Sequence, residues 1–132
     1  MATSGFEGLY VETQNYGATA AFWSSLGFDS VFETGHGSGQ WQHPAGGPYV
    51  FINEVHEGDP EIRPILSVAE AAAFNPSRAP DFAQPFAPQH WGVMEAVIRD
   101  PDGRHVNLQA PVPEGVVVPD ANVHHEEKYG AH

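Results

Sequence analysis

Residues 90–111 read HWGVMEAVIRDPDGRHVNLQAP, and this stretch decides the fold more than any other. Two runs rich in strand-forming residues, 91–99 and 104–110, flank Asp-Pro-Asp-Gly, where proline suits the second position of a tight turn and glycine the last. The order predicts an antiparallel β-hairpin. Apolar and polar side chains alternate along the second run, which gives that strand one apolar and one polar face. The apolar residues are Val106 and Leu108, and the polar ones are His105, Asn107 and Gln109.

The first half of the chain predicts one helix among strands. GLYVET at residues 8–13 alternates and is rich in strand-forming residues. Asn15 then suits a helix N-cap, and we expect a helix over residues 16–26 that ends at Gly27. Further strands are expected at residues 28–34, 40–43 and 49–55, separated by glycine- and proline-rich turns.

The second half repeats this order in outline. A strand at residues 61–68 is followed by a short helix at 69–74 and then by the hairpin described above. Pro64 suggests a bulge or an edge position for the strand that contains it. SRAPDFAQPFAPQ at residues 77–89 predicts an ordered loop, which leaves the second half one strand short of the first.

These elements predict an α+β fold with two βαβββ modules. The modules span about residues 6–57 and 60–111 of one domain over residues 1–112. The remaining residues, 113–132, are rich in proline, glycine and histidine, and we expect an irregular tail that is frayed or laid over a partner subunit.

Composition excludes several classes of function. Seventeen acidic residues against five basic ones give a formal net charge of −12, which repels nucleic acid and attracts cations and basic small molecules. No apolar run approaches the roughly 18 residues of a membrane-spanning helix. The chain has no cysteine and shows no signal-peptide pattern in its first residues, so we expect a cytoplasmic protein.

Two stretches resemble the signatures of the vicinal oxygen chelate superfamily, the glyoxalase/bleomycin resistance/dioxygenase proteins. AFWSSLGF at residues 21–28 is similar to A-F-Y-x-x-L-G-F, and residues 90–111 are similar to a signature of W-G, D-P-D-G and a following leucine. Ala18, Phe22 and Leu26 lie at i, i+4 spacing and predict a helical stripe that packs on a sheet.

The resemblance covers about residues 8–111 and implies a fold and a class of function. The fold would be two modules curled into a cup-shaped mixed sheet with helices on its outer face, usually in a homodimer. Non-catalytic members include strongly acidic self-resistance proteins that sequester bleomycin, mitomycin, thiocoraline or tiancimycin in crevices at the subunit interface.

Enzymes of this superfamily hold a divalent metal through His or Gln, His and Glu on the first, fifth and last strands. In this chain the resemblance places these positions at Gly8, Arg63 and Asn107. Glycine has no donor atom, arginine stays protonated, and a neutral asparagine is a poor replacement for a carboxylate. The resemblance therefore implies a member that binds a ligand without a metal or other cofactor.

Other catalytic arrangements are weak. The eight histidines form no HxxxH or HExxH pair, and we interpret His124, His125, Glu126 and Glu127 as a solvated polar run. GxSxG, GxGxxG and P-loop motifs are absent. A metal-dependent lyase or dioxygenase stays an alternative, as does a cofactor-free isomerase or cyclase.

Glu12 is one candidate base for such a cofactor-free reaction, and His90 is the other. Alternation places Glu12 with Gly8 and Tyr10 on the face that the resemblance assigns to the cup. There Glu12 would act as a base or receive a cationic group of the ligand.

Aromatic side chains provide the stronger signal, because flat rings can sandwich a planar ligand. Trp41 lies between two glutamines, an unusual context for a core residue, and Trp91 stands beside Gly92 where a loop enters a strand. The candidate ligand-binding residues are Tyr10, Glu12, Phe32, Trp41, His43, Tyr49, Phe51, Arg63, Phe86, His90, Trp91 and Asn107. The sequence thus favours a homodimer that sequesters a bulky aromatic natural product.

Overall fold

Eight β-strands, one α-helix and one short 3₁₀-helix make up the regular structure of residues 2–119, the part of the chain that the computed structural model describes. In chain order they are β1 (Phe6–Thr13), α1 (Tyr16–Ser25), β2 (Asp29–Glu33), β3 (Ser38–Gln42), β4 (Tyr49–Glu54), β5 (Ile62–Ser67), η1 (Ala71–Ala73), β6 (Asp81–Pro88), β7 (Val93–Arg99) and β8 (His105–Pro111).

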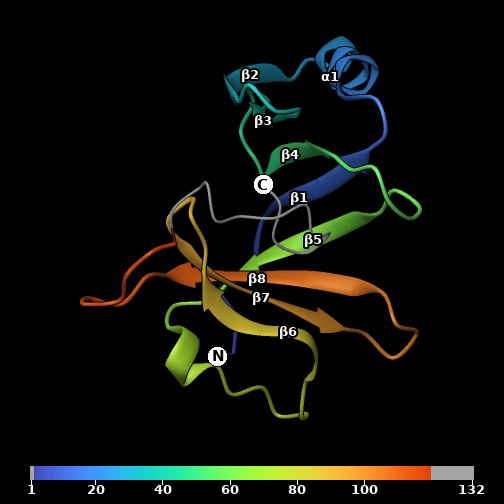
Figure 1. The fold of residues 1–132 in the computed structure, drawn as a ribbon. Helices are drawn as coiled ribbons and strands as arrows, with labels where there is room; N and C mark the ends of the chain where they lie inside the picture. The colour runs from blue at the N-terminus through green and yellow to red at the C-terminus, as the bar shows by residue number, and fades with distance from the viewer. Residues whose placement is uncertain (1, 120–132) are drawn as a thin grey trace.

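The strands form one curled sheet in the order β2-β3-β4-β1-β5-β8-β7-β6. Each half has the same internal order, because β5 takes the place of β1 and β6, β7 and β8 take the places of β2, β3 and β4. The halves join where β1 runs antiparallel to β5 (Figure 1). The predicted α+β fold of two βαβββ modules in a cup-shaped sheet is confirmed.

The predicted loop at residues 77–89 is wrong, because it contains strand β6. Its prolines argued against a strand, but β6 is an edge strand and pairs only with β7. The pairing shifts register between Phe82 and Gln84 and again between Gln84 and Ala87, the interval that contains Pro85. An edge position with irregular pairing tolerates proline because few ladder hydrogen bonds are lost.

Pro64 lies in the middle of the sheet and not at an edge. Strand β5 is flanked by β1 and β8, although the pairing with β8 begins only at Ile65. The irregularity of this region falls on the partner strand, where the register shifts between Phe6 and Gly8. The edge position suggested for Pro64 is therefore wrong.

Helix α1 packs through a different stripe from the predicted one. Asn15 caps the helix by accepting a hydrogen bond from the backbone N–H of Ala18 at 3.1 Å, as expected for an N-cap. The side chains of Phe22 and Leu26, however, are 57% and 51% exposed. The stripe that faces the sheet contains Tyr16, Ala20 and Trp23, because its large aromatic rings fill the space over β1 and β4.

Two apolar clusters cover the outer face of the sheet, one in each module. Under α1 the first cluster includes Val11, Val50 and Ile52. Beside η1 the second includes Ala96 and Leu108. The opposite face, which carries Tyr10, Phe51 and Ile65, is called the concave face below. The polar set of β8 lies on the concave face and its apolar set on the outer face, as alternation predicted.

No helix within residues 2–119 is long and apolar enough to cross a membrane. After β8, residues 112–119 have no helix or strand. The polar run at His124, His125, Glu126 and Glu127 lies outside the described residues.

Candidate functional site

The concave face holds a cavity of about 530 Å³. Most of its surface is apolar, although six of the twelve described lining residues have polar side chains. The lining residues are Glu7, Phe32, Thr34, His36, Gln40, Tyr49, Phe51, Ile65, His90, Trp91, Val93 and Gln109. Cavities of roughly 300–1,000 Å³ with this mixture are typical of small-molecule sites.

Both modules build the wall of the cavity. Tyr49 and Phe51 are two residues apart on β4 and therefore project from the same face of the sheet. His90 and Trp91 lie in the turn between β6 and β7, which is closed by hydrogen bonds within Gln89–Val93. Gly92 allows this turn, because its φ of +89° is unfavourable for other residues. The turn thereby brings the second module's aromatic residues opposite those of the first.

Five of the candidate residues named from the sequence line this cavity: Phe32, Tyr49, Phe51, His90 and Trp91. Phe32 lies 6.2 Å from Phe51, and the rings of His90 and Trp91 meet edge to face at 4.9 Å. The structure thus gathers the aromatic residues of two strands and one turn around a single space. Their role in binding stays a prediction.

Three other candidates lie on the outer face, so their predicted place in the cup is wrong. Trp41 is 8% exposed and belongs to the core under α1, because alternation on β3 directs it away from its neighbour Gln40. His43 packs against Phe28 at 5.2 Å, beyond the end of the strand. Phe86 packs against Phe74 at 5.7 Å in the core of the second module.

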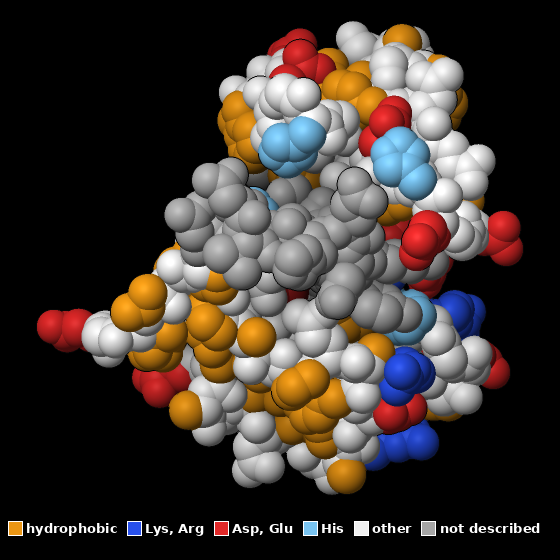
Figure 2. All heavy atoms as spheres, in the orientation of Figure 1, with side chains coloured by type: hydrophobic (Ala, Val, Ile, Leu, Met, Phe, Trp, Pro, Cys, Tyr) orange, Lys and Arg blue, Asp and Glu red, His pale blue; other side chains and the backbone are white. Residues whose placement is uncertain are grey.

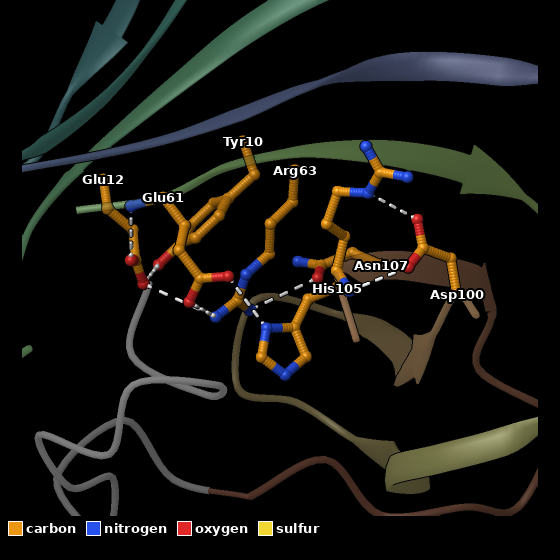
Figure 3. A network of polar contacts seen from close by, with 8 residues as sticks. Tyr10, Glu12, Glu61, Arg63, Asp100, His105 and Asn107 are labelled. Carbon is orange, nitrogen blue, oxygen red and sulfur yellow. Dashed lines mark hydrogen bonds and ion pairs between the residues drawn. The ribbon is translucent and has the colours of Figure 1, made fainter. Parts of the chain in front are cut away.

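The remaining four candidates form a buried polar network on the concave face, together with Glu61 (Figure 3). Arg63 is at its centre, with Nη2 3.2 Å from Glu61 Oε2 and 3.7 Å from Glu12 Oε2. Its Nη1 donates to Asn107 Oδ1 at 3.4 Å, and its guanidinium lies 5.3 Å from the centre of the Tyr10 ring. These side chains pair mainly with one another and link β1, β5 and β8.

Glu12 is therefore poorly placed to act as a base on a ligand. It is 4% exposed, and its Oε1 accepts the backbone N–H of Glu61 at 3.0 Å. Its Oε2 accepts from the Tyr10 hydroxyl at 3.4 Å. Burial raises the pKa of Tyr10 well above its ordinary value, with the charge of Glu12 acting in the same direction. This network stabilises the fold more readily than it could bind or react with a ligand.

Sequence reasoning missed the polar residues at the other end of the concave face. Glu7 Oε2 accepts from the Tyr49 hydroxyl at 2.6 Å, and Gln109 Nε2 donates to Glu95 Oε2 at 2.8 Å. Gln109 was assigned to the concave face by alternation but was not named as a site residue. Glu95 lies on β7 opposite Gln109, so the register of the hairpin at residues 90–111 carried the signal.

Burial shifts the acid–base chemistry at this end of the face. It raises the pKa of Glu95 to about 7, with Gln109 and Arg63 opposing the shift and the charge of Glu7 adding to it. Burial and the hydrogen bond to Glu7 raise the pKa of Tyr49 far above its ordinary range. Tyr49 therefore stays protonated and donates to Glu7, whereas Glu95 exchanges its proton near neutral pH.

The cavity lining includes no lysine or arginine among the described residues. On the face shown in Figure 2, acidic side chains are spread over both halves, while the basic ones gather at one edge of the lower half. Several arginines are paired on the surface: Arg99 with Asp81, and Arg104 with Asp100 and Asp102. Glu7 is therefore a carboxylate of the cavity lining that no lysine or arginine of the described lining opposes.

Comparison with known proteins connects this architecture to a family of folds. No protein-family model and no curated protein matches the sequence. Among solved structures, a glyoxalase/bleomycin resistance protein/dioxygenase superfamily member from Vibrio splendidus 12B01 superimposes with a TM-score of 0.62 at 14% identity, covering 78% of this chain and 96% of the other. The chain has the fold of this superfamily.

Two further structures agree with the glyoxalase/bleomycin resistance/dioxygenase fold. One is called an NAD-dependent benzaldehyde dehydrogenase from Legionella pneumophila, with a TM-score of 0.62, 11% identity and coverage of 79% and 97%. The other is BphC, a halotolerant catechol dioxygenase, with a TM-score of 0.51 and 13% identity, covering 86% of this chain and 42% of that one. At these identities the likeness concerns the fold alone.

The metal of the superfamily's enzymes does not fit the residues at the corresponding positions. A Cβ on Gly8 would lie 2.6 Å from the ring of Tyr49, so the ring occupies the space of a ligand side chain. Arg63 places a fixed cation at the second position, and Asn107 offers a neutral amide that accepts from it. Within residues 2–119, no group of three or more His, Asp or Glu is placed to hold a metal ion.

Proposed function

We propose that this protein binds and sequesters a bulky aromatic antibiotic or related natural product without catalysing a reaction on it. The observation that carries the proposal is the cavity between Tyr49 and Phe51 on one side and the turn with Trp91 on the other. Sequestration would protect the producing cell, because the bound molecule no longer reaches its target.

The size and chemistry of the cavity support this class of ligand. A volume of about 530 Å³ suits several fused or linked rings. Each aromatic pair contributes about 0.5–1.5 kcal/mol beyond the burial of its area. The ring of Trp91 comes from a turn and packs against His90, whereas Tyr49 and Phe51 are placed by the sheet.

We further propose that the protein acts as a homodimer in the cytoplasm, with the ligand in crevices at the subunit interface. Several large apolar side chains are exposed in a single copy, including Phe6 (72%), Ile62 (62%), Phe22 (57%) and Val31 (56%). The proposed dimer would cover part of this exposed apolar surface. Light scattering coupled to gel filtration should give twice the mass of one chain, and a monomer would contradict the dimer.

Calorimetric titration of the full chain with bleomycin, mitomycin C, thiocoraline and tiancimycin tests the binding proposal. We expect at least one of them to bind, and Trp91→Ala to weaken that binding about 5- to 30-fold, through loss of about 1–2 kcal/mol of contact energy. Phe82→Ala is the matched control, because Phe82 is a partly exposed aromatic residue outside the cavity. Failure of all four to bind would count against the proposal.

A cofactor-free isomerase or cyclase is a second candidate, favoured by the place of His90 in the cavity lining. The two candidates differ in the fate of the ligand. After long incubation with the protein, a sequestered antibiotic should be recovered unchanged by chromatography. A product whose formation is lost in His90→Gln would identify an enzyme instead.

A further inference from the structure

The cavity has two chemically different ends. Phe32, Phe51 and Trp91 provide apolar and aromatic surface, whereas Glu7, Gln109 and the hydroxyl of Tyr49 provide polar groups. Glu95 lies behind Gln109 and is 0% exposed. A planar ligand that fills the aromatic end therefore extends to the polar end. The hydrogen-bond donors and acceptors there determine which group of the ligand can bind.

Gln109 presents an acceptor to this space. Its side chain is more than nine-tenths buried, at 8% exposure, and it lines the cavity. Its Nε2 donates to Glu95, which orients the amide so that its carbonyl oxygen Oε1 points away from that carboxylate. Within the described residues no hydrogen bond to this oxygen is formed, and the oxygen stays accessible from the cavity. A ligand that displaces water from this acceptor must supply a donor, because a buried acceptor without a partner costs free energy.

The other polar groups also accept rather than donate. Glu7 accepts a hydrogen bond from the Tyr49 hydroxyl and has further lone pairs on its carboxylate. The nearest guanidinium, that of Arg63, is engaged by Glu61, Glu12 and Asn107, although its charge also acts on Glu95. The polar end thus holds carboxylates and an amide oxygen, and the described lining of the cavity includes no lysine or arginine.

We propose that this end of the cavity is a subsite for a protonated amine carried by the aromatic ligand, with Glu7 and the carbonyl oxygen of Gln109 as its direct acceptors and Glu95 as a second negative charge behind them. The inference rests on the proposed function and narrows its ligand class to aromatic amines. An ammonium group supplies several N–H donors and a positive charge, and therefore matches all three groups.

A matched set of probes separates this inference from the proposed function. 9-(Aminomethyl)anthracene, 9-anthracenemethanol and anthracene-9-carboxylate share one ring system and carry a cation, a neutral donor and an anion. With the full chain at neutral pH, calorimetry or fluorescence titration should show the amine binding at least about tenfold more tightly than the alcohol, and the carboxylate most weakly.

Two substitutions test whether Glu7 and Glu95 cause the tighter binding of the amine. Glu7→Gln and Glu95→Gln should each reduce the preference for the amine over the alcohol about tenfold while leaving the affinity for the alcohol within about twofold. Glu33→Gln is the control, because it removes one negative charge from β2 outside the cavity lining. Unchanged binding of the alcohol also shows that each variant is folded.

The pH dependence provides a second readout. Glu95 is faced by Tyr10 and Glu7 from β1, Tyr49 from β4, Arg63 from β5 and Gln109 from β8. Among these, Glu95 exchanges its proton near neutral pH, so affinity for the amine should rise between about pH 6 and 8 in the natural chain and rise less in Glu95→Gln. The alcohol, which carries no charge, is the control for effects of pH that do not depend on the charge of the ligand.

The outcomes are distinct. Equal affinity for the amine and the alcohol, or an amine preference that survives in both Glu7→Gln and Glu95→Gln, would overturn the subsite and leave the aromatic cavity intact. If none of the three probes binds while one of the four antibiotics does, the subsite is overturned and the proposed function stands; if neither the probes nor the antibiotics bind, both are wrong.

Discussion

The two ends of the concave face use their polar groups in different ways. Around Arg63, two carboxylates and an amide pair with a single guanidinium whose residue is 0% exposed. Around Glu7 and Gln109, acceptors face a cavity that the side chains of the described residues leave open. The two ends are built on the same strands, since β1 contributes to both and so does β8.

This difference distinguishes buried polar groups that stabilise the fold from those that are available to bind a ligand. A polar group satisfied by its neighbours offers a ligand nothing new and costs stability when its partner is removed. A polar group that faces a cavity without a partner is useful only when something binds. The following predictions test this division, beginning with the largest effect.

Arg63→Met should destabilise the fold by about 3–5 kcal/mol, because it leaves the Glu12 carboxylate buried without its cation. Urea denaturation of the variant measures this loss. The control is Arg99→Met at the exposed pair with Asp81, where we expect a change of about 1 kcal/mol or less. A loss of similar size in both variants would show that the buried network has no special role.

Substitution of the two tryptophans expected in the cup, Trp41 and Trp91, should have different effects on stability and on ligand binding. Trp41→Ala removes a ring from the core under α1 and should cost about 3–5 kcal/mol of stability. Trp91→Ala removes a ring from a turn and should cost about 1 kcal/mol, while carrying the loss of binding predicted above. Thermal or urea unfolding of both variants decides the matter, and the reverse ranking would place the wrong residue in the cavity.

Because the pKa of Glu95 is shifted, we expect the free energy of unfolding to depend on pH. Its pKa is raised from 4.5 to about 7 in the folded chain, so the folded state holds its proton more tightly than the unfolded state. Its contribution is fully present below about pH 4.5 and is lost as the pH rises through about 7, on the order of 3 kcal/mol in all. Comparing the pH profile of unfolding in Glu95→Gln with that of the natural chain isolates this term. Identical profiles would mean that Glu95 titrates normally.

Gly8→Ala should have a smaller effect, about 1–3 kcal/mol, because its Cβ would push the Tyr49 ring aside. The hydrogen bond from Tyr49 to Glu7 would be strained at the same time. Gly17→Ala in α1 is the matched control: its Cβ would meet no atom closer than 3.8 Å, and we expect stabilisation of about 0.5–1 kcal/mol. Equal effects at the two glycines would contradict the close approach at Gly8.

Much of the fold could be predicted from the sequence because its signals are local. The N-cap at Asn15 and the hairpin turn at residues 100–103 depend on neighbouring residues only, and both were found. Strand β6 was missed because its prolines are tolerated only by its edge position, which is a property of the whole sheet. The buried stripe of α1 was misassigned because two apolar stripes compete on that helix, and the sheet beneath it decides between them.

The candidate site was only partly predictable for a related reason. Alternation placed Tyr49 and Phe51 together, but Trp41 was selected for its glutamine neighbours when its own parity on β3 directs it to the core. Glu95 carries no sequence signal as an acid of unusual pKa, since the shift arises from burial beneath residues of other strands. The polar end of the cavity forms because strand pairing brings Glu7, Tyr49, Glu95 and Gln109 together, and residue type alone does not reveal this.

The most direct test of the central claim, that an aromatic ligand binds beside Trp91 on the concave face, is a two-dimensional ¹H–¹⁵N spectrum of the tryptophan indole groups. The chain has three tryptophans, and Trp→Phe variants assign their peaks. On saturation with 9-anthracenemethanol, the indole peak of Trp91 should move strongly while those of Trp23 and Trp41, on the outer face, stay in place. Movement of the Trp23 or Trp41 peak with that of Trp91 unchanged would contradict the account.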